Sequence, residues 1–499
     1  MSSFADDILY MGLTTDPDRH AVTDGFGDWT WRGLQEQVVQ AEKYLRGLDL
    51  PKRSRVVLVG PDSVWHQIML LACSRAEMIF VPVNNRYTSA DADHVMRLIK
   101  PAVGLLHPDF ASMFAHTGAQ TMNEKMGPFD LVAWTGDAKD LSQVQTQRTP
   151  ILITLTSGST AAPKPVLYSA EGELAVARLH GALWRLNSSD LMLAPPAFSW
   201  IYGLGTSNLT GLMSGSRALM LERFSPTLLC DRAEGRGVTI FMGVVTHFRI
   251  LVDYCEKTGR RPFGPELRMA VSGGERRDEV AFAKFEEMFG VPVLDLYASS
   301  EGRPGFGYDP YTDPRPVTGS CGRVIPGVQA KVEADEHGDL AGELHLRSAG
   351  NYMGYFDPER LVKPEITPTD WLPMGDRFEI TDDGWGFVIG RRKDVIIRGG
   401  ANISPVEVES VIAQHPKVTG VAVVGIESAS HGEFVAAAVE GDFSGLEDPS
   451  AALAEHCEQQ LAKFKVPTYW LTVDSLPRNS NGKLDKTAIK SLFGTTAPA

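Results

Sequence analysis

The sequence lacks most of the features that mark a secreted, membrane-spanning or metal-bound protein. Its five cysteines are odd in number and scattered, and no C-x-x-C pair suggests a zinc site, an iron–sulfur cluster or a redox dithiol. The most apolar stretch, residues 68–83, contains Arg75 and Glu77 and is shorter than the ~20 residues needed to span a bilayer. The opening residues show no basic segment followed by an apolar run. These absences predict a cytoplasmic protein without integral membrane association.

Positive charge is also scarce. The 48 lysines and arginines are outnumbered by 62 aspartates and glutamates, which gives a formal net charge of −14. Nucleic acids and anionic membranes are bound through basic surfaces, so neither is expected as the main partner. Any polyanionic ligand must therefore be bound at a local positive site. The 499 residues, 43% of them hydrophobic, suffice for roughly three folded, domain-sized units.

Short apolar runs that alternate with helical stretches predict an α/β fold. A strand, a helix and a second strand follow one another over residues 56–83, and the same alternation returns over 190–221 and 239–297. Such βα units imply mostly parallel sheets covered by helices. After about residue 315 the chain turns to short strands separated by turns, which predicts antiparallel β structure.

A second boundary is expected at the end of the turn-rich region, where a new α+β unit begins. Helices are predicted over residues 405–415 and 450–464 of this unit, with apolar strands between them. The predicted domains are therefore residues 1–392 and 393–499.

The most informative segment is TSGSTAAPK, residues 156–164, which follows a buried strand at 151–155. Small residues let backbone N–H groups approach a phosphate, hydroxyls add donors, and a lysine supplies charge. The loop is not of the G-x-x-x-x-G-K-[ST] type, and no G-x-G-x-x-G dinucleotide fingerprint occurs in the sequence. The segment is consistent with a triphosphate loop, with a flexible surface turn as the alternative.

Eight segments, in a fixed order, resemble the adenylate-forming superfamily of acyl- and aryl-CoA synthetases, peptide-synthetase adenylation domains and firefly luciferase. They are TSGSTAAPK, APPAFSWIYGLG, SGGE, YASSEG, GELHLRSAGNYMGYFDPE, MGDRF, GRRKDVIIRGGANISPVEVE and PRNSNGKLDK. The resemblance covers essentially the whole chain. It implies a large N-terminal adenylation domain, which binds ATP and a carboxylic acid and consists of packed βαβ subdomains plus a distorted antiparallel β-barrel. It also implies a small mobile C-terminal α+β cap.

The resemblance also implies the ATP contacts. Tyr297 would lie against the adenine, Ser300 near the α-phosphate, and Glu301 on Mg²⁺, a hard cation that prefers carboxylate oxygens. Asp376 would accept from the ribose hydroxyls, with Arg391 on the same sugar. The full set implied for ATP is Thr156, Ser157, Gly158, Ser159, Thr160, Lys164, Gly273, Gly274, Glu275, Tyr297, Ala298, Ser299, Asp376 and Arg391. The alternatives are that Tyr297 is a core residue, that Glu301 is a surface acid, and that Asp376 belongs to a simple Gly-Asp turn.

The terminal unit carries three further implied roles. Lys483 would bridge the acyl carboxylate and the α-phosphate, lending a compact positive charge during adenylation. Lys393 would be the hinge, because the family places its pivot two residues after the arginine at 391. Gly399 and Gly400 would leave room for the thiol-bearing arm of coenzyme A after the cap rotates. The alternatives are that Lys483 is an exposed loop lysine, that residues 391–393 form a solvated basic run, and that the glycine pair is only a turn.

The acid-binding segment indicates the substrate class. Amino-acid-activating relatives place an aspartate in the segment equivalent to AFSWIYG, but residues 198–202 contain no acid. A buried ammonium without a partner would be costly, so a plain carboxylic acid is expected. The segment most resembles that of aryl-CoA ligases of the benzoate type. The residues expected to line an apolar or aromatic slot are Trp200, Tyr202, Gly203, His247 and Ser272.

Some positions depart from the family pattern. Ala161 and Pro165 replace glycines in the phosphate loop, Ala298 replaces a glycine in the adenine motif, and Trp200 stands where many acyl-CoA synthetases have histidine. An alanine at a position that needs positive φ would be strained, which puts the loop geometry and full activity in doubt.

The sequence thus predicts an ATP-dependent carboxylate ligase that forms an acyl-adenylate and then an acyl-CoA thioester from an aromatic or other hydrophobic acid. Its substrates and cofactors would be ATP, Mg²⁺ and coenzyme A. One alternative is a stand-alone adenylation enzyme that loads a carrier-protein phosphopantetheine. Another is a catalytically idle relative that acts as a binding protein. A homodimer is left open.

Overall fold

The computed structural model describes residues 3–134, 140–156, 163–275, 277–334, 341–398, 401–428, 432–478 and 483–494. It divides into two compact units. The first unit comprises the described residues of Met1–Thr156, Pro163–Ala330 and Leu346–Leu372, and the second those of Lys331–His345 and Pro373–Ala499. The mixed α/β class is confirmed. The domain boundary between residues 392 and 393, which the sequence analysis predicts from the family hinge, stays a prediction.

The first unit contains a sheet that places the phosphate loop. Across it the strands are β20 (Leu361–Val362), β19 (Gly354–Asp357), β9 (Lys164–Ser169), β8 (Pro150–Thr156), β4 (Ile79–Pro82), β3 (Arg55–Val59), β5 (Val103–Leu106), β7 (Phe129–Trp134) and β6 (Ala119–Met126). The βαβ unit predicted over residues 56–83 is confirmed, with β3 and β4 parallel and joined by α3 (Val64–Arg75). Helix α3 is buried from Val64 to Cys73, which explains why most of its residues are apolar, with His66 and Gln67 as buried polar exceptions.

The second sheet of this unit carries the other motifs. Its strands run β16 (Ser320–Val324), β15 (Phe306–Gly307), β14 (Val293–Tyr297), β13 (Met269–Gly273), β12 (Ile240–Gly243), β10 (Leu191–Leu193), β11 (Arg217–Leu219), β1 (His20–Asp24) and β2 (Gly27–Thr30). Strands β10 to β14 pair in parallel, as the two predicted βα repeats require. The carboxyl ends of β13 and β14, where SGGE and YASSEG begin, therefore meet at one edge.

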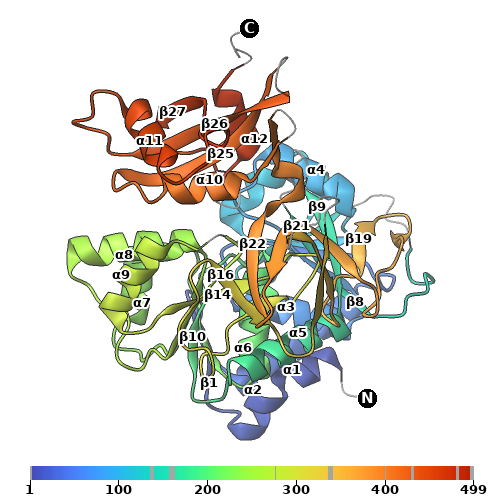
Figure 1. The fold of residues 1–499 in the computed structure, drawn as a ribbon. Helices are drawn as coiled ribbons and strands as arrows, with labels where there is room; N and C mark the ends of the chain where they lie inside the picture. The colour runs from blue at the N-terminus through green and yellow to red at the C-terminus, as the bar shows by residue number, and fades with distance from the viewer. Residues whose placement is uncertain are drawn as a thin grey trace. The chain divides into compact units, whose positions relative to one another are not determined.

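Helices cover both sheets (Figure 1). They are α1 (Phe4–Thr15), α2 (Trp31–Gly47), α3, α4 (Ser89–Ile99), η1 (Pro108–Phe114), α5 (Ala170–Leu183), η2 (Tyr202–Leu209), α6 (Thr210–Met213), α7 (Pro226–Ala233), α8 (Val245–Thr258) and α9 (Glu279–Phe289). Helices α8 and α9 pack on the second sheet through a cluster of phenylalanines, with Phe248 and Phe285 each in ring contact with Phe241 of β12. This cluster forms much of the core beneath the motif-bearing edge.

The predicted helical stretch after Trp200 has π-helical geometry in η2. The side chains of Ser207 and Asn208 donate to the carbonyl oxygens of Tyr202 and Gly203, five residues earlier, at 2.8 and 2.7 Å. These bonds fit the wider turn of a π-helix and satisfy carbonyl oxygens in a buried segment.

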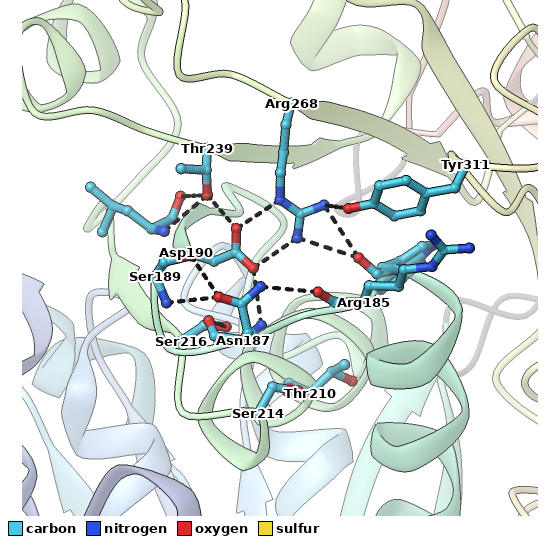
Figure 2. A network of polar contacts seen from close by, with 12 residues as sticks. Arg185, Asn187, Ser189, Asp190, Thr210, Ser214, Ser216, Thr239, Arg268 and Tyr311 are labelled. Carbon is cyan, nitrogen blue, oxygen red and sulfur yellow. Dashed lines mark hydrogen bonds and ion pairs between the residues drawn. The ribbon is translucent and has the colours of Figure 1, made fainter. Parts of the chain in front are cut away.

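A polar network ties the end of α5 to the second sheet (Figure 2). Asp190 is 1% exposed and accepts from the Thr239 hydroxyl at 2.9 Å and from the Arg268 guanidinium at 2.7 and 2.8 Å. The backbone N–H of Asn187 also donates to Asp190, at 3.1 Å. Arg268 in turn donates to the Tyr311 hydroxyl at 3.1 Å. Each charged group in this network therefore has several partners.

The second unit consists of an antiparallel part and an α+β part. The strands of the first part are ordered β17 (Gln329–Ala334), β18 (Gly342–Arg347), β21 (Leu372–Ile380) and β22 (Trp385–Arg391), followed by the short helix η3 (Arg392–Asp394). The second part has strands in the order β24 (Ala401–Ile403), β23 (Ile396–Arg398), β26 (Gly432–Gly441) and β25 (Val418–Ser428), with β27 (Tyr469–Val473) parallel to β26. The antiparallel strands expected after residue 315 are present, and their closure into a barrel stays a prediction.

The helices of the second unit are α10 (Pro405–Ile412), α11 (Pro449–Glu458) and α12 (Lys486–Leu492). Two of them end earlier than the sequence predicts. Helix α10 ends at Ile412, and the turn that follows leads to His415, which the next residue, Pro416, disfavours in helical geometry. Helix α11 ends at Glu458, and residues up to 464 form turns. In the part of the chain that the structure describes, no helix combines the length and the apolar character needed to cross a membrane.

Candidate active site

Strands β8 and β9 hold the two ends of the predicted phosphate loop together. Thr156 and Lys164 are paired in the antiparallel register, and the Thr156 hydroxyl lies 3.4 Å from the Lys164 carbonyl oxygen. The Lys164 side chain is exposed. Pro165 lies in β9 opposite Leu155, where its fixed φ suits an extended strand. The loop residues between these ends, Ser157, Gly158, Ser159, Thr160 and Ala161, lie outside the described residues.

The YASSEG motif forms a tight turn at the end of β14. The Ser299 hydroxyl oxygen accepts from the backbone N–H groups of Glu301 and Gly302 at 3.1 and 3.0 Å, and the Ser299 N–H donates to the Gly302 carbonyl at 3.0 Å. Ser299 therefore shapes the turn that presents Ser300 and Glu301. The strain expected at Ala298 is absent, because Ala298 is not among the residues with positive φ. Its replacement of glycine is compatible with this turn.

Tyr297 ends β14 and is partly buried. Its ring packs against Phe306 of β15 with the centroids 6.1 Å apart and the planes at 74°. Gly305 lies against it so closely that a Cβ atom there would be 2.7 Å from the Tyr297 carbonyl oxygen. One side of the ring is thus supported by the sheet, and its contact with adenine stays a prediction.

Tyr355 of β19 brings two motif residues together. Its hydroxyl donates to Glu301 Oε1 at 2.9 Å, and Lys164 Nζ lies 5.3 Å from the centroid of its ring. The backbone N–H of Tyr352 donates to the Glu301 carbonyl at 2.9 Å. Because β19 pairs with β9, Tyr355 lies opposite Val166, two residues from Lys164. The segment GNYMGYFDPE was identified as a motif from the sequence, but that reasoning gave Tyr355 no role.

A buried ion pair lies behind this turn. Arg303 and Glu173 of α5 are both 1% exposed and hydrogen-bonded to each other, and the Arg303 guanidinium lies over the Tyr168 ring at 4.7 Å. Burial raises the pKa of Glu173, although the charge of Arg303 opposes the shift. Arg303 Nε and Nη1 and Glu173 Oε2 have no partner among the described residues. Sequence reasoning missed this pair, although Arg303 directly follows YASSEG.

His180, also on α5, is fully buried near the ion pair. Its ring stacks on Trp184 with centroids 4.6 Å apart and an interplanar angle of 11°. Burial first, and then the charge of Arg303, lower the pKa of His180 to about 3. The imidazole is therefore neutral at physiological pH.

The SGGE segment packs against the predicted acid-binding segment. The Tyr202 hydroxyl donates to the Gly243 carbonyl at 3.1 Å, and a Cβ atom at Gly273 would lie 3.3 Å from Tyr202 Cζ. Gly274 has φ +80°, a conformation that favours glycine. A Cβ atom at Gly203 would lie 2.2 Å from the Pro196 carbonyl oxygen, so glycine is required there for close backbone packing.

The other predicted acid-binding side chains, Trp200, His247 and Ser272, carry no charge, whereas Glu275 belongs to the predicted ATP set. Burial lowers the pKa of His247 to about 3, helped by the charge of Arg86, and the His247 ring packs on Phe224 with centroids 4.3 Å apart. Trp200 Nε1 and Ser272 Oγ are buried and have no partner among the described residues. Glu275 Oε2 lies 3.4 Å from both the N–H and the hydroxyl of Thr246.

One carboxyl group near this segment was not identified from the sequence. Asp62 Oδ1 accepts from the Phe198 N–H at 3.0 Å, and burial raises the pKa of Asp62 to about 7. The Phe198 N–H and the charge of Arg86 oppose the shift. Asp62 is 136 residues from Phe198 in the sequence, so no local pattern could have predicted the contact.

The second unit brings the two predicted ribose contacts together. Asp376 of β21 and Arg391 of β22 are paired in the antiparallel register, with Arg391 Nε 3.4 Å from Asp376 Oδ1. Beside them is an open pocket of about 420 Å³ lined by Met374, Gly375, Arg391, Arg392 and Lys393. Three cationic residues thus line a concave surface next to a buried aspartate. This is a local positive site on an acidic protein, as the net charge requires for a polyanionic ligand.

The remaining cap residues are only partly described. Lys393, the predicted hinge, lies in η3. Lys483 is partly buried, and its neighbour Leu484 forms a bridge to Arg478. Gly399 and Gly400 lie outside the described residues. Lys483 belongs to the second unit and Glu301 to the first.

The donors around Glu301 fit a magnesium ion bound together with ATP. Mg²⁺ is usually held by one or two carboxylates plus substrate phosphates rather than by a full protein cage. Glu301 offers a carboxylate, of which Oε1 is positioned by Tyr355. Among the described residues no cluster of three or more His, Cys, Asp or Glu residues could hold a metal ion alone. Such a magnesium site would therefore be completed by the nucleotide.

Comparison with protein-family models gives two matches in chain order. The model described as AMP-binding enzyme matches residues 12–356, and the AMP-binding enzyme C-terminal domain matches residues 407–483. The chain belongs to the AMP-binding enzyme family. The family membership predicted from the eight segments is confirmed.

Relatives of this AMP-binding enzyme span its whole length. The indoleacetate–CoA ligase of Aromatoleum aromaticum is 26% identical over 92% of both chains. The mitochondrial malonate–CoA ligase ACSF3 of Homo sapiens is 24% identical over 95% of this chain and 89% of its own. The crystal structure of ATP-bound MatB from Rhodopseudomonas palustris matches with a TM-score of 0.82 and 25% identity, covering 98% of this chain and 99% of that one.

Proposed function

We propose that this AMP-binding enzyme is an ATP-dependent carboxylate–CoA ligase that forms an acyl-adenylate, releasing pyrophosphate, and then an acyl-CoA thioester, releasing AMP. The acid–thiol ligase class predicted from the sequence is confirmed by the two family matches and by relatives of that class. The observation that carries the proposal is the meeting of Lys164 and Glu301 around Tyr355, at the base of the predicted phosphate loop.

In the first half-reaction a carboxylate oxygen of the acid attacks the α-phosphorus of ATP, and pyrophosphate leaves. Such a reaction depends mainly on positioning and on neutralising phosphate charge. Lys164 would bind the β- and γ-phosphates, and Ser300 and Tyr297 would contact the α-phosphate and the adenine. Glu301 would hold Mg²⁺, which, when bound, neutralises phosphate charge. Lys483 would then stabilise the charge that develops between carboxylate and α-phosphate.

In the second half-reaction the thiol of coenzyme A attacks the acyl carbonyl, and AMP leaves. A cap that turns about Lys393 would withdraw Lys483 and present Gly399 and Gly400 to the thiol-bearing arm. Support comes from the sequence resemblance and from relatives that are CoA ligases. A carrier-protein phosphopantetheine, which ends in the same arm, is the alternative acceptor.

The acid is proposed to be aromatic or otherwise hydrophobic. Trp200, Tyr202 and His247 offer aromatic surface, and the neutral His247 ring adds no charge that would select an ionic group. The relatives act on acids as different as indoleacetate and malonate, so family membership alone leaves the acid open. The structural support for a hydrophobic acid is thus the uncharged character of these side chains.

Cytoplasmic location and a homodimeric state stay proposals. The five cysteines are buried and free of disulfides, as in a reducing compartment.

ATP–pyrophosphate exchange tests this function. Wild-type enzyme with Mg²⁺ should exchange label only when a suitable aromatic, fatty or polycyclic acid is added. Productive acids should then be tested with CoA, pantetheine and holo carrier protein as acceptors. Preference for CoA supports the ligase, whereas preference for the holo carrier supports the loading enzyme. Failure of every acid in a broad panel would favour the idle relative.

A further inference from the structure

Tyr355 is held in place by three independent contacts. Its strand, β19, pairs with β9, which places Tyr355 beside the strand that begins at Lys164. The Tyr352 ring packs edge-on against the Tyr355 ring, with centroids 5.4 Å apart and planes at 75°. The Tyr355 hydroxyl is bonded to Glu301. The ring is nevertheless 38% exposed, so it lies at the surface where a nucleotide can approach.

The hydroxyl contact restricts the Glu301 carboxylate. A glutamate side chain has three rotatable bonds, and ordering a free one costs conformational entropy when a ligand binds. The bond from the Tyr355 hydroxyl to Oε1 restrains the carboxylate before any ligand arrives and occupies one of its two oxygens, so we take Oε2 as the oxygen for a cation. A phenol keeps its proton at neutral pH, so the Tyr355 hydroxyl can donate to the Glu301 carboxylate.

The ring of the same residue restricts Lys164. The ammonium lies 5.3 Å from the ring centroid, within the range of a cation–π interaction. A lysine at the end of a loop would otherwise sample many rotamers. One side chain thus orients a cation and an anion that come from motifs 137 positions apart in the numbering, Lys164 and Glu301.

We propose that Tyr355 is a positioning residue for the Mg²⁺–ATP complex, with its hydroxyl orienting Glu301 toward the metal and its ring orienting Lys164 toward the phosphates. This inference rests on the proposed function. It goes further by assigning two separable roles to one side chain, so that the loss of the hydroxyl affects metal-dependent binding and the loss of the ring affects phosphate binding. A tyrosine that only fills space would show neither dependence.

The chain offers a matched control in Tyr311. It is 48% exposed, its hydroxyl accepts from Arg268 at 3.1 Å, and the Arg185 guanidinium lies 3.8 Å from its ring centroid. Tyr311 therefore has the same two kinds of contact as Tyr355, but in the Asp190 network (Figure 2). Tyr311→Phe removes a comparable hydroxyl from a comparable surface without touching the motif residues.

The experiment measures ATP affinity by calorimetry on the full-length protein, once with Mg²⁺ and once with EDTA. Tyr355→Phe is expected to raise the Kd for ATP about tenfold with Mg²⁺, as for loss of a hydrogen bond to a charged group, and less than about twofold with EDTA. Tyr355→Leu is expected to raise the Kd by about threefold more in both conditions, because the cation–π contact is also lost. Tyr311→Phe should match the wild type in both.

A double-mutant cycle with Glu301→Gln tests the coupling from the other side. If the hydroxyl acts through Glu301, then Tyr355→Phe should have no further effect in the Glu301→Gln background. Additive effects would overturn the proposal, as would an equal loss of affinity with Mg²⁺ and with EDTA. Wild-type protein that binds ATP but uses no acid would overturn the proposed function and leave the role of Tyr355 standing. Wild-type protein that does not bind ATP would overturn both.

Discussion

Two partly exposed tyrosines in the first unit bridge charged side chains, but the groups they bridge differ in how completely they are satisfied. Tyr311 accepts from Arg268, and Arg268 is bonded through two nitrogens to Asp190, which also accepts from Thr239 and Asn187. Tyr355 donates to Glu301, and within the described residues it supplies the side-chain hydrogen bond to that carboxylate. The first network is saturated by the protein itself, whereas the second leaves an oxygen for a ligand.

The same contrast holds for two ion pairs, the partly buried Arg268–Asp190 and the fully buried Arg303–Glu173. The Arg268–Asp190 pair has further protein partners, whereas Arg303 and Glu173 keep atoms without partners among the described residues. Buried polar groups are normally satisfied, so unsatisfied ones mark places where a ligand, a water or a conformational change completes the structure. Asp190 therefore keeps other partners when one contact is removed, whereas Glu173 depends on Arg303 for its charge partner.

The largest effect on the free energy of unfolding is expected from breaking the Arg303–Glu173 pair. Arg303→Met leaves the Glu173 carboxylate buried without its charge partner, which should lower the free energy of unfolding by about 3–5 kcal/mol. Arg268→Met should lower it by only about 1–3 kcal/mol, because Asp190 keeps the Thr239 hydroxyl and the Asn187 N–H. Urea denaturation of both variants measures the difference.

The double variant Glu173→Gln/Arg303→Met is the control for this comparison. It removes both charges, so much of the lost stability should return. A larger loss for Arg268→Met than for Arg303→Met would contradict the contrast between the two pairs.

The next largest effect separates the two half-reactions. Lys483→Ala should slow ATP–pyrophosphate exchange by about 100-fold, since removal of one preorganised group that stabilises developing charge typically has this effect. Thioester formation from supplied acyl-AMP should change by less than about threefold, because the lysine is proposed to act only in adenylation. Lys486→Ala, three residues further on and paired with Glu409, is the matched control. Equal losses in both half-reactions would refute the role given to Lys483.

A smaller effect concerns pH. The pKa of His180 is lowered to about 3 by burial and by Arg303, against an ordinary value near 6.5. As the pH falls, His180 is therefore protonated in the unfolded chain at a higher pH than in the folded protein. The stability that neutral His180 contributes is complete above about pH 6.5 and is lost at about 1.4 kcal/mol per pH unit below it.

His180→Phe keeps the stack on Trp184 and removes the titration. Between pH 6.5 and pH 5 the free energy of unfolding should fall less steeply for this variant than for the wild type. Chemical denaturation across that range measures both slopes, and identical slopes would show that His180 is protonated in the folded protein.

Local patterns in the sequence predicted much of this molecule. Short apolar runs predicted the βαβ unit around α3, and the ordered motifs identified the family. The motifs also assigned Asp376 and Arg391 to the same ribose, and the β21–β22 register pairs these two residues. What could not be predicted depends on long-range pairing. Tyr355 meets Glu301 across 54 residues and Arg303 meets Glu173 across 130, through strand and helix packing that no local period encodes.

Backbone details also escaped prediction for physical reasons. The strain expected at Ala298 does not arise, because the Ser299 hydroxyl forms the turn without positive φ at that position. The helix expected over residues 405–415 ends at Ile412. The π-helical turn of η2 depends on side-chain bonds from Ser207 and Asn208 that hydrophobic periodicity does not report.

Product analysis tests the central claim most directly. The wild-type enzyme is incubated with Mg²⁺–ATP, CoA and an acid that supports exchange, and the products are separated by chromatography and identified by mass spectrometry. AMP, pyrophosphate and the acyl-CoA should form in equal amounts. An acyl-AMP should accumulate when CoA is left out. Formation of ADP and phosphate in place of AMP and pyrophosphate would contradict the two-step adenylation that the motifs and the Lys164–Tyr355–Glu301 arrangement support.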